Sequence, residues 1–81
     1  MTYIATFFSH FGAIRFKKRC DENHWPARIM PVPRNLSSSC GTCVRCESQQ
    51  PFFPDGHSDE VEQIVQVLPE GYRVHYRAEN S

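Results

Sequence analysis

The sequence predicts an α+β fold of the ferredoxin-like type, with the order βαββαβ and a four-stranded sheet that carries two helices on one face. Short runs rich in aromatic and β-branched residues alternate with two stretches whose apolar residues recur at helical spacing. Proline, glycine and serine gather between these runs, as is typical of turns and loops. With 81 residues, 40% of them hydrophobic, the chain is expected to form a single small domain over residues 1–81.

The first half reads as strand, helix and strand. Residues 3–8 are aromatic and β-branched and predict a first strand. Ser9 is a typical N-cap for a helix over residues 10–22, and residues 27–30 predict a second strand that Pro31 ends. The helix carries an apolar stripe that would face the sheet and consists of Ala13, Phe16 and Cys20.

The second half is expected to repeat the pattern. Residues 41–47 favour a strand with Cys43 and Cys46 on opposite faces, although a helix would align Cys40, Cys43 and Cys46 on one side. Residues 48–57 have the composition of a loop, and Ser58 would then cap a second helix. Its expected apolar stripe consists of Val61, Ile64, Val65 and Leu68. Residues 72–76 alternate and predict the last strand.

Charge and composition exclude several classes of protein. Nine acidic and nine basic residues leave a formal charge of zero, which argues against nucleic-acid and anionic-membrane partners. No apolar run approaches the roughly 20 residues of a membrane-spanning helix, and the first residues lack the pattern of a signal peptide. A cytoplasmic location is therefore expected. The four cysteines are then expected to stay reduced rather than to form structural disulfides.

The segment over residues 30–41 is the candidate functional loop. Pro31 and Pro33 take the chain out of regular structure, and three serines and Arg34 lead to Cys40. A cysteine reacts as its thiolate, which nearby cations and backbone N–H groups stabilise. Arg34 is the nearest cation along the loop, so the sequence favours a reactive Cys40 over a buried, inert thiol.

Two other interpretations of the cysteines remain open. The spacing of Cys40, Cys43 and Cys46 resembles part of an iron–sulfur or zinc ligand set, for which Cys20 or a histidine would have to supply the fourth ligand. Alternatively, Cys43 is a resolving thiol that forms a disulfide with Cys40, as in a thiol-redox regulator. His10 begins the first helix and could come near the loop, although a solvated histidine is the plainer interpretation.

Three motifs resemble one family. They are Thr6-Phe7-Phe8-Ser9 with Ala13, Met30-Pro31-Val32-Pro33-Arg34, and Ser37-Ser38-Ser39-Cys40-Gly41, of which the last is the most specific. The sequence thus resembles the selenium/sulfur carrier protein-like family of small bacterial and archaeal domains. The two further thiols after Gly41 and the long 49–57 segment depart from the family pattern.

The resemblance implies a carrier rather than a stand-alone enzyme, with no cofactor. Cys40 would hold sulfur or selenium as a persulfide or selenenylsulfide, in a setting formed by Arg34, Ser39 and Gly41. Its expected partners are a donor, such as a cysteine desulfurase or selenocysteine lyase, and an acceptor enzyme.

Overall fold

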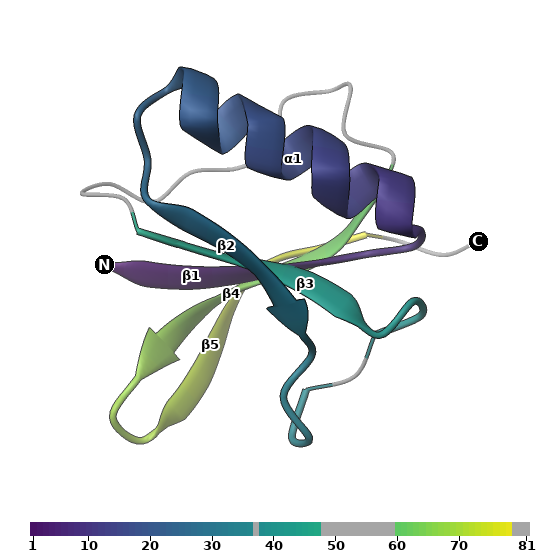
Figure 1. Ribbon diagram of the computed structural model, residues 1–81. Helices are drawn as coiled ribbons and strands as arrows, with labels where there is room; N and C mark the ends of the chain where they lie inside the picture. Colours follow the sequence, from purple (N-terminus) through teal and green to yellow (C-terminus); the bar gives the residue numbers. More distant parts are fainter. Residues whose placement is uncertain (37, 48–59, 79–81) are drawn as a thin grey trace.

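The computed structural model describes residues 1–36, 38–47 and 60–78 of the chain. Their elements, in order, are β1 (Thr2–Phe7), α1 (His10–Glu22), β2 (Ala27–Pro31), β3 (Thr42–Glu47), β4 (Val61–Leu68) and β5 (Gly71–Arg77). Within these residues the strands form one antiparallel sheet in the order β2-β3-β1-β4-β5. Helix α1 lies across one face of this sheet (Figure 1).

The first half of the predicted pattern is confirmed. Strands β1 and β2 both pair antiparallel with β3, which lies between them, so they run parallel to each other and α1 makes the crossover. The hydroxyl of Ser9 accepts a hydrogen bond from the Gly12 amide at 3.3 Å and caps α1, which spans the predicted residues. The residues of the expected apolar stripe, Ala13, Phe16 and Cys20, are all buried.

The prediction of a second helix is wrong, and so is the prediction of a ferredoxin-like fold with four strands and two helices. The residues expected to form that helix instead form β4, which pairs with β1 on one side and β5 on the other. The β-branched residues of this segment, which favour a strand, are Val61, Ile64, Val65 and Val67. The described chain is therefore a five-stranded sheet with one helix.

A β-bulge explains why β4 has the spacing of a helix. Phe7 pairs with Val61 and Thr6 pairs with Gln63, so Glu62 is an extra residue with no partner across the ladder. Because of this extra residue, Val61 and Ile64 both join the core cluster beneath α1 although they are three residues apart. Val65 lies in the cluster on the opposite face, as its neighbour in a strand must.

Strand β5 completes the sheet where the last strand was predicted. The predicted loop over residues 48–57 and the proposed cap at Ser58 lie outside the described residues. In the described ranges no helix has the length and apolar character needed to cross a membrane.

The sheet is buried on both faces, although a helix covers only one. Beneath α1 the core includes Tyr3, Phe7 and Ile64. On the opposite face Ile4, Cys43 and Val65 are buried. The side chains packed against them come from β2, the β2–β3 connection, β4 and β5, and they are Met30, Val32, Leu36, Val67 and Tyr72. The connection from β2 to β3 therefore helps to cover the face of the sheet that is opposite α1.

Candidate functional site

The candidate loop lies at the end of the sheet where several elements meet. The pairing of Pro31 with Thr42 places the end of β2 beside the start of β3. The pairing of Thr6 with Cys43 places the end of β1 there as well, and β4 begins opposite Phe7. Helix α1 starts three residues after β1 ends. Residues 32–41, which include Cys40, therefore leave and re-enter the sheet next to the start of α1.

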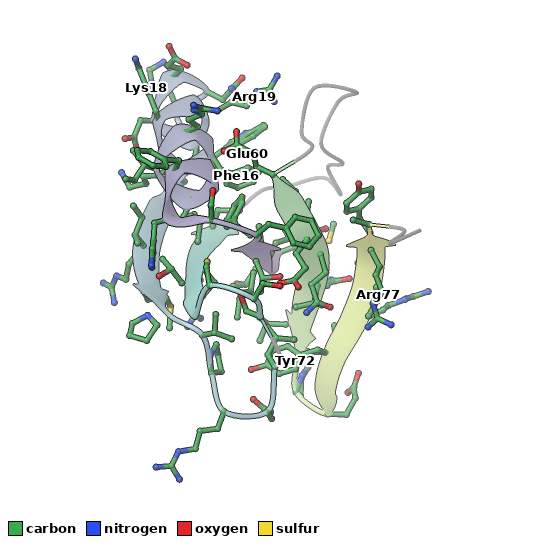
Figure 2. All side chains as sticks on the ribbon, turned by 90° about the vertical axis from the view of Figure 1, so that its right-hand side faces the viewer. Phe16, Lys18, Arg19, Glu60, Tyr72 and Arg77 are labelled. Carbon is green, nitrogen blue, oxygen red and sulfur yellow. The ribbon has the colours of Figure 1, made fainter. Side chains whose placement is uncertain are left out.

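The loop is anchored to the sheet rather than projecting from it. The Val32 amide donates a hydrogen bond to the Gly41 carbonyl at 3.1 Å, which closes the loop. Further along, the hydroxyl of Tyr72 on β5 donates to Oδ1 of Asn35 at 3.3 Å; Figure 2 shows Tyr72 beside the β4–β5 turn. Val32 and Leu36 pack against the apolar cluster of the second face. These contacts tie the described residues of the loop to the sheet at both ends and in the middle.

Cys40 differs from the other thiols in its exposure. All four cysteines lie in the described part of the chain, and Cys40 alone is not fully buried. Its side chain packs against the core beneath α1, and Sγ donates to the Thr42 carbonyl at 3.5 Å. Gly41, which follows, has φ +73° and open space within 4 Å of where a Cβ would stand. The loop therefore presents one thiol next to uncrowded space.

Two hydrogen-bonded contacts hold the loop, one on each side of Cys40. On the α1 side, Nδ1 of His10 and Oγ1 of Thr42 lie 2.9 Å apart. On the β4 side, the amide and the hydroxyl of Ser39 donate to the carboxylate of Glu62 at 3.0 and 2.7 Å. His10 is exposed, as the plainer interpretation held, and it also makes this contact at the start of β3. A role for Glu62 was not predicted from the sequence, because this residue was expected on a helix and not on a strand next to the loop.

The carboxylate of Glu62 has an unusual environment for a surface acid. It also accepts a hydrogen bond from Oγ1 of Thr6 at 3.3 Å, so three donors converge on it. Burial on its own raises the pKa of Glu62, but the hydrogen bonds from Ser39 and Thr6 outweigh it and hold the pKa below its ordinary value. The group is therefore a charged acceptor at neutral pH.

The predicted cation does not contact the thiol. Arg34 is exposed in the turn of the loop and makes no hydrogen bond or ion pair with the described residues. The basic run over residues 17–19 lies in the later turns of α1, and Figure 2 shows Lys18 and Arg19 far from Tyr72. The contacts that the structure gives for the Cys40 side chain are with the apolar core beneath α1 and with the Thr42 carbonyl, and not with a guanidinium.

The other three cysteines are buried, Cys20 and Cys46 in the core beneath α1 and Cys43 on the opposite face of the sheet. Sγ of Cys43 lies on the far face of the sheet and donates to the Pro31 carbonyl at 3.7 Å; burial, and secondarily Cys40 nearby, raise its pKa to about 11. Cys46 lies beneath α1, and its hydrogen bond with Cys20, together with burial, raises its pKa. Among the described residues no three Cys, His, Asp or Glu side chains are grouped to hold a metal ion. Cys43 is protonated at neutral pH, which makes it a weak resolving nucleophile.

Sequence comparison supports the same segment of the chain. The model of the family described as "Putative Se/S carrier protein-like" matches residues 2–52, which is more than half of the 81 residues. This range covers β1 to β3 and includes Cys40, whereas β4 and β5 lie beyond it. No curated protein and no solved structure matches the chain. The chain belongs to this Se/S carrier protein-like family.

Proposed function

We propose that this protein is a carrier that holds sulfur or selenium on Cys40, as a persulfide or a selenenylsulfide, between a donor and an acceptor enzyme. The observation that carries the proposal is the exposure of the four thiols. Cys40 is the one that is not fully buried, and it lies on an anchored loop inside the segment that matches the family. A carrier requires this combination, because the thiol must be reachable and must be presented in a reproducible position.

The transfer is a displacement at sulfur. The Cys40 thiolate attacks the terminal sulfur of a persulfide on the donor's cysteine, the donor's S–S bond breaks, and its electron pair leaves on the donor cysteine. A new S–S bond then joins the transferred atom to Cys40. The proton of the Cys40 thiol passes to solvent or to the departing thiolate, so the step needs no external oxidant or reductant. Transfer to the acceptor repeats the same displacement.

The surroundings of Cys40 suit this role. Gly41 leaves open space beside the thiol, which a second chalcogen atom and the partner's reacting group would need. Backbone N–H groups at Cys40 and Gly41 can stabilise the anion of the loaded form, and Arg34, exposed on the same loop, can contact the partner. A cysteine desulfurase or a selenocysteine lyase is the expected donor. The cytosol, where thiols stay reduced, is the compartment in which such a carrier would work.

Mass spectrometry of the loaded protein tests the proposal. After incubation with a cysteine desulfurase and cysteine, we expect one added sulfur atom, and after a selenocysteine lyase with selenocysteine, one added selenium. The tryptic peptide over residues 35–45 contains both Cys40 and Cys43, so the Cys40→Ser and Cys43→Ser variants are needed to assign the site. Loading should disappear in the first and persist in the second. An unmodified wild type with both donors, or equal loading of Cys40→Ser, would overturn the proposal.

A further inference from the structure

We infer that Glu62 is a positioning residue for Cys40, which holds the reactive loop through Ser39 in the geometry that chalcogen transfer requires. The inference rests on the proposed function and adds a residue from outside the segment that matches the family. It starts from the bulge in β4. Since Phe7 pairs with Val61 and Thr6 with Gln63, Glu62 is the extra residue, and a bulge redirects the side chain of such a residue.

The redirected side chain reaches the loop immediately before Cys40. Oε1 of Glu62 accepts from the Ser39 amide at 3.0 Å and Oε2 accepts from the Ser39 hydroxyl at 2.7 Å. Ser39 is thus held through both its backbone and its side chain. These two bonds fix the position and the orientation of the peptide that leads into Cys40. Thr6, fully buried in β1, donates to the same carboxylate at 3.3 Å and connects it to the centre of the sheet.

The hydroxyl of Ser38 adds to this picture. Its oxygen is buried close enough to the same carboxylate to help lower the pKa of Glu62, although it makes no well-aligned hydrogen bond with the described residues. Two consecutive serines of the loop, Ser38 and Ser39, therefore face the carboxylate of Glu62.

The charge state of Glu62 sets the pH range in which this contact holds. The groups that face the carboxylate, from β1 and from the loop, are uncharged hydroxyls and an amide, and no charged side chain of the described residues shifts its titration. The nearest acid on the same segment, Glu60, is paired with Arg15 of α1 at 2.6 Å instead. Because the hydrogen bonds lower the pKa of Glu62, the contact is fully formed above pH 4.5 and is released as the pH falls through the lowered value.

The experiment compares Glu62→Gln and Ser39→Ala with Glu60→Gln, a matched loss of one negative charge two residues away that leaves the loop untouched. The maximum rate of sulfur loading from a cysteine desulfurase should fall about tenfold in Glu62→Gln, since a small misplacement of a reacting group is costly, while the donor concentration for half-maximal rate stays unchanged. Ser39→Ala should show a smaller loss, and the double variant should be no slower than Glu62→Gln, because both act through one contact. Glu60→Gln should load as the wild type does.

A second readout needs no donor. In the wild type the NMR shift of the Ser39 amide proton should titrate with a midpoint below pH 4.5, and this titration should vanish in Glu62→Gln. If the wild type loads but Glu62→Gln loads as fast as Glu60→Gln, the inference is wrong and the proposed function stands. A Ser39 amide that does not titrate also overturns the inference. A wild type that takes up no chalcogen overturns the proposed function itself, and the positioning role falls with it.

Discussion

Replacing Gly41 with alanine should weaken the fold and the chemistry together. Gly41 has φ +73°, a backbone conformation that residues other than glycine and asparagine adopt only at a cost in free energy. A Cβ at this position would meet no atom within 4 Å, so the cost is purely conformational. We expect Gly41→Ala to lower the free energy of unfolding by about 1 kcal/mol and Gly41→Asn by about half as much.

Urea denaturation measures this effect directly. With a slope near 1 kcal/mol/M for a chain of this size, the midpoint should fall by about 1 M in Gly41→Ala and by about half of that in Gly41→Asn, with the slope unchanged. The hydrogen bond from the Val32 amide to the Gly41 carbonyl closes the loop next to Cys40. The rate at which Cys40 is loaded should therefore be highest in the wild type, lower in Gly41→Asn and lowest in Gly41→Ala.

Gly71 supplies the matched control. It has φ +142°, also with open space around a Cβ, and it lies at the β4–β5 turn, where the next residue, Tyr72, contacts Asn35 of the Cys40 loop. Gly71→Ala should cost at least as much stability as Gly41→Ala but slow the loading of the folded protein less, because its neighbour Tyr72 contacts the far part of the loop and not Cys40. Equal midpoints for Gly41→Ala and Gly41→Asn, or a Gly41→Ala protein as stable as the wild type, would refute the reasoning from φ. Equal loading of the Gly41→Ala and Gly71→Ala proteins would refute the link between this turn and the thiol.

Two further predictions follow from the surroundings of the loop. Burial raises the pKa of Cys43 from 9.0 to about 11, so the unfolded chain loses this proton before the folded protein does, and the free energy of unfolding should fall by up to about 2 kcal/mol between these pH values. Urea titrations at several pH values should show a shallower fall in Cys43→Ala, and an identical pH slope would contradict the assignment. Thr42→Val removes the contact with Nδ1 of His10 and should cost about 0.5 kcal/mol, since the contact is exposed, while Thr42→Ser should keep it. Denaturation of the two variants checks this, and an equal loss in both would point to packing rather than to the hydrogen bond.

The first half of the fold could be predicted because its local signals agree with its tertiary environment. Ser9 caps α1, and the buried stripe of α1 has the spacing of a helix. Strand β3 alternates as expected, with Cys43 and Cys46 on opposite faces. In β4 the local signal and the structure disagree, because the bulge at Glu62 brings Val61 and Ile64 to the same face although they are spaced as in a helix. The residue types, rich in valine and isoleucine, were the signal that favoured a strand.

The candidate site was predictable to the extent that it is local in sequence. The prolines and serines around Cys40 indicated a loop, and that loop carries the one thiol that is not fully buried. Its long-range contacts were not predictable, because they depend on which strand ends lie side by side. Arg34, close in sequence, makes no hydrogen bond or ion pair with the described residues, whereas Glu62, 22 residues beyond Cys40, holds the neighbouring Ser39.

The segment that matches the family is structurally incomplete without the strands that follow it. Strand β1 lies in the middle of the sheet, with β3 on one side and β4 on the other. The match ends at residue 52, so the pairing of β1 with β4 and the burial of Ile4 against Val65 depend on residues beyond it. Those residues also bring the acceptor for Ser39. The bulge that gives the apolar residues of β4 the spacing of a helix therefore also serves the site. The extra residue at the bulge is Glu62, and its side chain contacts both Thr6 and the loop.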